Sequence, residues 1–164
     1  MDMKQILILG LCLVPVWTCN MNRCFNESEL IGAVNRTLKR CYPQPEEPQH
    51  AGKHDSDPSC PVAFFPQYGG IHERSLSPWR YVLVTMEDHF PSTYAKAECL
   101  CSGCILIQAN KSPVESHDYN SYAVMQNRVF LKRELCNDKT KYRLTPVTVK
   151  VAVGCTCLRA KTSN

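Results

Sequence analysis

The cysteines are the residues of this chain whose type and spacing could do chemistry. There are eleven among 164 residues, and five of them lie in two short clusters. The first cluster, in "AECLCSGC", holds Cys99, Cys101 and Cys104, and the second, at the end of "VTVKVAVGCTC", holds Cys155 and Cys157. Clustered thiols can bind a metal ion, exchange electrons or form structural disulfides.

A zinc site and a thioredoxin-like redox site both fit these clusters poorly. Cys101 and Cys104 have CxxC spacing, but a single residue between two cysteines of a strand is poor geometry for the second half of a zinc site. A redox CxxC opens a helix in an α/β setting, whereas Ile105–Ile107 predicts a strand and no βαβ pattern follows. A structural disulfide framework explains the pattern best.

The first residues indicate secretion, which favours disulfides. Residues 1–19 combine Lys4 with the apolar run Ile6–Val14, as secretory signal peptides do, and we expect cleavage near Thr18 or Cys19. The run is too short to span a bilayer, so the protein is expected to be extracellular and not membrane-anchored. Disulfides persist outside the cell and staple small domains.

The number of cysteines left after cleavage suggests a covalent dimer. Loss of Cys12 and Cys19 with the signal would leave nine of the eleven cysteines. Nine is odd, so one thiol stays free or at least one bridge joins two chains. The net charge of +4, without a dense Lys/Arg tract, does not indicate a nucleic-acid partner.

Short antiparallel strands are predicted to hold the clusters. Strand patterns cover Trp79–Thr85, Ala123–Arg133 and Tyr142–Cys157, and Lys139–Lys141 forms the polar tip of a hairpin between the last two. In a regular strand, alternation would place six residues of the last segment on one face: Val147, Val149, Val151, Val153, Cys155 and Cys157. The fold class expected from these patterns is all-β, a small domain of antiparallel strands.

The segments between the strands are expected to be turns, loops and one helix. Glu87–Pro91 reads as a polar turn and Asn110–Asn120 as an exposed loop. Leu30, Ile31, Val34 and Leu38 recur at helical spacing, with Ser28 and acidic residues as possible caps.

Four regions follow from this reading. Residues 1–19 are the signal peptide, 20–59 an N-terminal extension with a Pro/His-rich linker, 60–158 the β domain and 159–164 a C-terminal tail. The linker, "YPQPEEPQHAGKHDSDPS", is almost free of apolar residues and is expected to be a flexible arm.

No enzyme motif is present in the sequence. There is no GxSxG, HExxH or glycine-rich phosphate loop. The five histidines are scattered through predicted loops: His50, His54, His72, His89 and His117. No catalytic, metal or cofactor site is therefore predicted, and the chain is not expected to be an enzyme.

Three motifs resemble the interleukin-17 cytokine family in their order and intervals. They are "RSLSPWRY" (Arg74–Tyr81), "AECLCSGC" (Ala97–Cys104) and "VAVGCTC" (Val151–Cys157), and the agreement covers roughly residues 60–158. "HERSLSPWRY", "EDHFP" and "CFNESEL" are most similar to the family's interleukin-17C branch. The resemblance implies a cystine-knot-like fold with the bridges Cys99–Cys155 and Cys104–Cys157.

The resemblance also implies how two protomers would be joined. Cys60 of one chain and Cys136 of the other match the cysteines that link family protomers. Cys24, Cys41 and Cys101 remain unassigned, and we expect Cys101 to meet Cys24 or Cys41.

By this resemblance, the chain is a secreted dimer that brings together single-pass interleukin-17-type receptors and triggers inflammatory or defence signalling. The expected partner protomer is an identical chain, and a heterodimer is the alternative. Trp79, Arg80 and Tyr81 are the candidate receptor contacts, because aromatic and Arg anchors dominate many interfaces. The competing interpretation places Trp79 in the core.

A second function class is a secreted binder that does not signal. Such a protein would be a decoy, an inhibitor or a cationic antimicrobial polypeptide. The basic residues near the hairpin tip are interleaved with acidic and polar ones, which favours a solvated hairpin face instead. Three sequons predict N-glycosylation, at Asn26, Asn35 and Asn110.

Overall fold

The computed structural model describes residues 19, 22–48, 59–64, 69–109 and 112–159. Within these ranges, three helical elements are present: α2 (Glu27–Cys41), the 3-10 helix η1 (Val62–Phe64) and α3 (Ile71–Arg74). Seven strands follow: β1 (Trp79–Thr85), β2 (His89–Phe90), β3 (Thr93–Cys99), β4 (Cys104–Ile107), β5 (Pro113–Ser116), β6 (Tyr119–Leu135) and β7 (Tyr142–Arg159). Every strand pair among the described residues is antiparallel, which confirms the all-β prediction.

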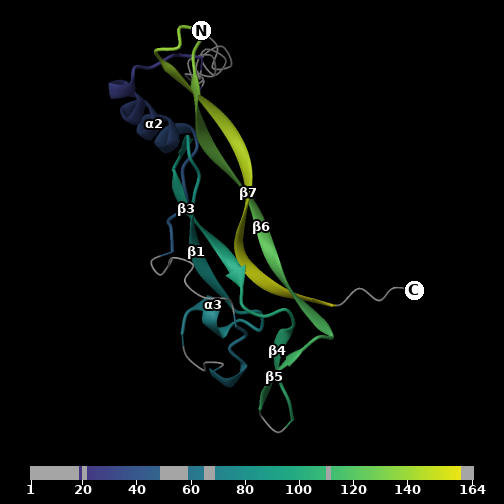
Figure 1. Cartoon of the computed structure of the whole chain (residues 1–164). Coiled ribbons are helices and arrows are strands. Elements are labelled where there is room, and N and C mark those ends of the chain that lie inside the picture. The colour runs from purple at the N-terminus through teal and green to yellow at the C-terminus, as the bar shows by residue number, and fades with distance from the viewer. Residues whose placement is uncertain (1–18, 20–21, 49–58, 65–68, 110–111, 160–164) are drawn as a thin grey trace, which may run out of the picture.

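The long β6–β7 hairpin is the spine of the molecule (Figure 1). Its two strands pair from Leu135 opposite Tyr142 at the tip to Tyr119 opposite Arg159 at the far end. At the tip, Asp138 Oδ1 accepts hydrogen bonds from the backbone N–H groups of Thr140 and Lys141, each at 3.1 Å. The polar hairpin tip expected from the sequence is therefore present.

A bulge in β7 overturns the expectation that four valines and two cysteines share one face. Opposite Val124 and Met125 stand Gly154 and Ala152, so Val153 has no partner in the ladder. One extra residue exchanges the faces of everything that follows it. By register, Cys155 and Cys157 consequently lie on the opposite face from Val149 and Val151.

The remaining strands form short pairs along the spine. β1 pairs with β3, β4 with β5, and β2 adds to the edge of β6. The polar turn expected at Glu87–Pro91 thus contains a two-residue strand, entered through Asp88 at a φ of 55°. The loop expected at Asn110–Asn120 contains β5 and the start of β6, because β4 needs an antiparallel partner for its backbone groups.

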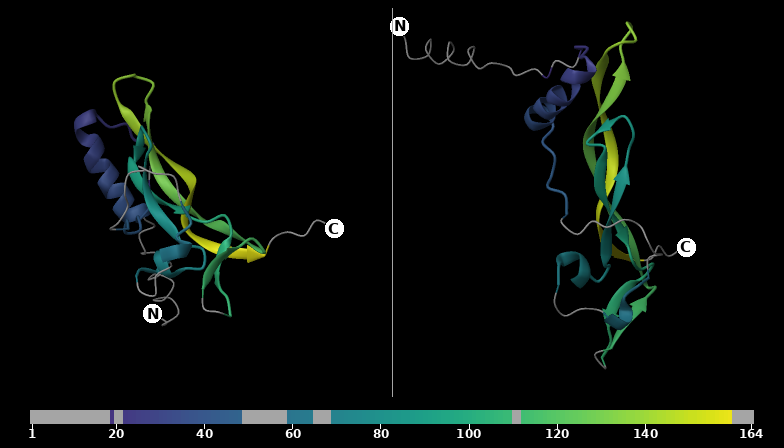
Figure 2. Two further views of the ribbon diagram at one scale, coloured as in Figure 1. Left: turned by 60° about the horizontal axis from the view of Figure 1, so that its bottom comes forward. Right: turned by 60° about the vertical axis from the view of Figure 1, so that its left-hand side comes forward.

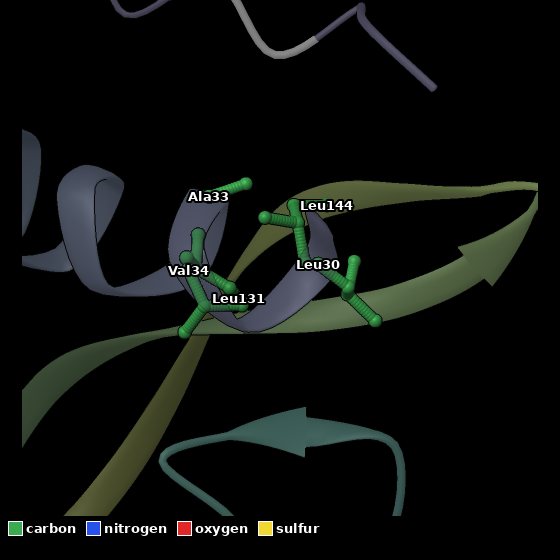
Figure 3. Packing of buried hydrophobic residues seen from close by; sticks show 5 residues of the cluster. All are labelled: Leu30, Ala33, Val34, Leu131 and Leu144. Carbon is green, nitrogen blue, oxygen red and sulfur yellow. The ribbon is translucent and has the colours of Figure 1, made fainter. Parts of the chain in front are cut away.

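Helix α2 packs on the spine near the hairpin tip. Leu30, Ala33 and Val34 contact Leu131 of β6 and Leu144 of β7, and all five side chains are buried (Figure 3). The helical spacing predicted Leu30, Val34 and Leu38 for this face, and Leu38 packs partly buried against the cluster. Ile31 was also expected here but is 56% exposed, and Ala33 is buried instead. Asn26 rather than Ser28 precedes the helix at the N-cap position, and its side chain makes no capping hydrogen bond.

The molecule is elongated (Figure 2), and two further small cores lie along its length. Tyr94, Phe130 and Val151 form one, and Trp79, Ala97 and Cys155 form the other. Separate thin cores of this kind bury little apolar surface each, so covalent staples matter for stability. In the described part of the chain, no helix is both long and apolar enough to cross a bilayer.

Candidate functional site

The structure places two disulfides between the cysteine clusters. Cys99, the last residue of β3, is bonded to Cys155, and Cys104, the first residue of β4, is bonded to Cys157. Their Cα–Cα separations are 5.8 and 6.1 Å, within the range of disulfides. These are the pairs that the family resemblance implied. They fasten the β3–β4 corner to the part of β7 that follows the bulge.

The corner between Cys99 and Cys104 depends on Gly103 and Glu115. A Cβ atom at Gly103 would lie 2.5 Å from the backbone oxygen of Ser116, so only glycine fits there. The Glu115 carboxylate accepts hydrogen bonds from the backbone N–H of Gly103 at 2.7 Å and from the N–H and hydroxyl of Ser102 at 3.0 and 3.2 Å. β5 thereby holds the bend that directs both cysteines toward β7.

The Glu115 contacts predict a pH dependence. The hydrogen bond from Gly103 is the main cause of a lowered pKa for Glu115, whose ordinary value is 4.5. A carboxylate with a lowered pKa adds stability above its unfolded pKa, and that stability is lost as the pH falls through the folded-state pKa. Replacing Glu115 by alanine should therefore cost about 1–2 kcal/mol at neutral pH and less as the pH falls below about 4.5. Thermal unfolding of both proteins from pH 7 to pH 3 would measure this, and parallel curves would contradict it.

The interchain pairing of Cys60 with Cys136 is not what the structure shows. Cys60 is bonded to Cys101 of the same chain, and Cys136 is bonded to Cys24. A β-bridge between Phe25 and Tyr142 places the neighbouring Cys24 at the hairpin tip, where Cys136 lies. The expectation that Cys101 meets Cys24 or Cys41 was wrong, because Cys101 is bonded to Cys60 and the other two cysteines have partners of their own.

Cys19 also differs from the expectation. It is bonded to Cys41 at the end of α2, so a mature chain that keeps this bridge would have to be cleaved before residue 19. The ten cysteines from Cys19 onward form five bridges within one chain. The odd count that suggested a covalent dimer depends on the loss of Cys19 with the signal peptide, and with Cys19 retained the count is even. The rest of the expected signal peptide, and the Asn110 sequon, lie outside the described residues.

The three candidate receptor contacts have structural roles in this chain. Trp79 is 9% exposed and packs on Ala97 and Cys155. Arg80, half-buried, forms an ion pair with Glu98 at 2.8 Å, directly across the β1–β3 ladder. The hydroxyl of Tyr81 donates to the carbonyl oxygen of the bulged Val153 at 3.3 Å. The core interpretation of Trp79 is the one that the structure supports.

One group of possible metal ligands occurs among the described residues. The sulfurs of Cys60 and Cys101 and a carboxylate oxygen of Glu115 lie within 4.8 Å of one another. The two sulfurs are bonded to each other, so they are not thiolates, and the carboxylate holds the Gly103 bend. The arrangement suits a structural bridge and not a metal site.

An exposed apolar patch lies on the β6–β7 hairpin, on the face opposite Cys155 and Cys157. Tyr122 and Val124 of β6 and Leu158 of β7 share a face by register and are 59%, 42% and 46% exposed. Cys155 and Cys157 lie on the other face, under β3 and β4. We call the three exposed residues, Tyr122, Val124 and Leu158, the ribbon patch. The bulge keeps the cysteines off this face, since without the shift Cys155 and Cys157 would lie on the same face as Tyr122 and Val124.

Two sequons lie on or beside α2. Asn26 and Asn35 are exposed, on the side of the helix that does not face Leu131 and Leu144. A glycan at either position would stay in solvent.

Comparison with known proteins gives this geometry its context. A sequence model described as Interleukin-17 matches residues 75–159, which span β1 to β7 and all four cysteines of the two corner bridges. The chain belongs to the interleukin-17 family. Human interleukin-17C is 34% identical over 125 residues, which are 69% of this chain and 62% of that protein. Mouse interleukin-17C is 36% identical over 100 residues, and rat interleukin-17F is 36% identical over 103.

The likeness to the interleukin-17C branch expected from the sequence is therefore confirmed. The matched segment spans half of mouse interleukin-17C, 62% of human interleukin-17C and 60% of rat interleukin-17F, and it covers 57% and 59% of this chain in the mouse and rat comparisons. Members of the family are cytokines and not enzymes, which agrees with the missing catalytic motifs.

Proposed function

We propose that this chain is a secreted cytokine that acts by holding together cell-surface receptors of the interleukin-17 type. The observation that carries the proposal is the pair of bridges at the β3–β4 corner, within the segment that matches the family. A doubly stapled ribbon presents a fixed surface, and fixed surfaces bind partners with little ordering cost. Inflammatory or defence signalling would follow from receptor proximity.

The signalling form proposed is a symmetric homodimer without an interchain disulfide. A two-fold dimer offers each receptor the same face, so that two receptor chains are held together. The ribbon patch supports this assembly, because exposed contiguous apolar residues mark interfaces. A second copy of the same ribbon would cover it. Each protomer keeps its own Cys24–Cys136 and Cys60–Cys101 bridges.

A charge on the ribbon patch tests the assembly and the function together. We expect Tyr122→Asp with Val124→Asp to convert the dimer to a monomer and to lower receptor-dependent reporter activity at least tenfold. Both side chains are exposed, so the monomer's own stability should change by no more than about 0.5 kcal/mol per site. Sedimentation velocity and a receptor-bearing reporter cell line are the measurements.

The matched control is Ile31→Asp on the outer face of α2. Ile31 is 56% exposed and lies outside the ribbon patch, so dimerisation and signalling should be unchanged. Wild-type protein should run as a monomer in denaturing electrophoresis with or without reductant. A wild-type protein that signals fully but sediments as a monomer at micromolar concentration would contradict the dimer proposal.

The alternative of a cationic antimicrobial polypeptide has little support in the charges. Four basic residues near the hairpin tip are paired with acidic side chains: Lys132, Arg133, Lys141 and Arg143. Arg133 alone contacts Asp88 at 2.9 Å and Glu27 at 3.1 Å. A paired and locally neutral face is a poor ligand for acidic membranes.

A further inference from the structure

The segment after α2 is bound to the strands, although the sequence predicted a flexible linker. Tyr42–Pro48, which we call the arm, leaves the end of α2 without regular secondary structure (Figure 2). Gln44 donates from Nε2 to the carbonyl oxygen of Val129 in β6 at 3.0 Å. Glu47 accepts at Oε2 from the backbone N–H of Ala95 in β3 at 2.8 Å. The arm thus reaches two strands.

Arg128 of β6 is the main contact beneath the arm. It is 7% exposed, and its guanidinium lies over the rings of Tyr94 and Phe130 at 5.9 and 5.7 Å. Its Nη2 meets Glu47 Oε1 at 2.7 Å. Its Nε is buried and has no hydrogen-bond partner. A buried guanidinium with one empty donor is costly, so the contact with Glu47 satisfies it only in part.

The arm crosses a groove over β6 and β3 and does not fill it. Two hollows, of about 420 and 200 Å³, lie beside it, and Pro45, Gln126 and Arg128 line both. The smaller one is also lined by Tyr81 and by Ala95, whose N–H points away from β1 toward the arm. An occupant therefore meets a buried positive charge, an unpaired strand edge and apolar walls.

The arm's own composition indicates what this groove accepts. Its sequence, "YPQPEEP", places two glutamates between prolines. Residues that precede proline favour extended conformations, which lose little entropy on binding. An extended chain can pair with a free strand edge while its side chains enter pockets. A carboxylate that met Nε and Nη2 of Arg128 as a bidentate pair would satisfy the guanidinium better than Glu47 does.

We propose that this groove is a docking site for an extended, acidic, proline-bounded segment of a protein partner, and that the arm occupies it in the absence of that partner. The arm is tethered on both sides within its own chain, by Cys19–Cys41 before it and Cys60–Cys101 after it. A displaced arm therefore stays close and competes at a high effective concentration. Binding of a partner is limited by the release of Glu47 from Arg128. The proposal does not depend on the receptor proposed above.

A labelled peptide with the arm sequence, "YPQPEEP", tests this directly. We expect Glu47→Ala to release the arm and to raise the affinity for the peptide at least tenfold over wild type in fluorescence anisotropy. A peptide with both glutamates changed to glutamine should lose that gain. The matched control is Glu134→Ala, which removes an ion pair with Arg143 on the spine and should leave peptide binding at the wild-type level.

Hydrogen exchange at the Ala95 amide is the second measurement, and it needs no change at Arg128. Exchange should be faster in the Glu47→Ala variant than in wild type, and the peptide should slow it again.

A third variant tests Arg128 itself. Adding Arg128→Leu to the Glu47→Ala protein should abolish peptide binding. The proposal is overturned if Glu47→Ala binds the peptide no better than wild type, if the glutamine peptide binds equally well, or if the bound peptide leaves Ala95 unprotected.

Discussion

Replacing Cys99 and Cys155 together by serine is expected to remove most of the stability of this domain. The bridge closes a loop between residues 56 apart in sequence, for which the chain-entropy estimate is about 4 kcal/mol. Small domains have only about 5–15 kcal/mol in total. Serine would also place a hydroxyl in the cluster of Trp79 and Ala97, where Cys155 is buried. Secretion yield and chemical denaturation would measure the loss.

The bridge between Cys19 and Cys41 supplies the matched control. It closes a loop of 22 residues at the exposed end of α2, which stays attached through Cys24–Cys136 and the packing of Leu30. Serine at both positions should cost less and leave the β domain folded. Equal denaturation midpoints for the Cys99/Cys155 variant and wild type would show that the corner bridge does not stabilise the fold.

The strands with a clear local pattern could be predicted from the sequence, whereas β2, β3 and β5 were not. Trp79–Thr85 was expected with the same bounds as β1, and the expected strand at Tyr142–Cys157 falls within β7. The bulge could not be read from alternation, because every second residue of the segment is apolar or cysteine on either side of it. Gly154 was the available signal, since a glycine inside a strand often marks a bulge.

The cysteine pairings were only partly accessible. The two corner bridges followed from motifs that the family shares. The others depend on where residues 19–25 and 60 lie in the fold, which no spacing records. A signal boundary one residue earlier would have given an even count and removed the argument for a covalent dimer.

The groove beneath the arm could not be predicted from the sequence, because Arg128 and Glu47, which form its ion pair, are 81 residues apart. Arg128 did carry a signal. It falls in phase with the buried Phe130, two residues further along β6, and a charge on a buried face requires a partner. Nothing local identified that partner as Glu47, because prolines and charges are also typical of free linkers.

Trp79 could act in the core or as a receptor contact, and we expect the role in the core. Trp79→Ala should destabilise the protein by about 3–5 kcal/mol, the usual cost of removing a buried large aromatic side chain. Its ring lies 3.3 Å from a Cβ atom built at Gly154 and packs on Cys155, so the bulge and the corner bridge would both lose support. Trp79→Phe should recover more than half of that loss. Urea denaturation measures both variants.

Receptor binding separates this role from that of a contact residue. If Trp79 acts only through the core, Trp79→Phe should bind receptor within about twofold of wild type under conditions where both are folded. Tyr81→Phe is the companion variant, because it removes only the hydroxyl that donates to Val153. A Trp79→Phe protein that keeps wild-type stability but loses receptor affinity tenfold would return Trp79 to the binding surface.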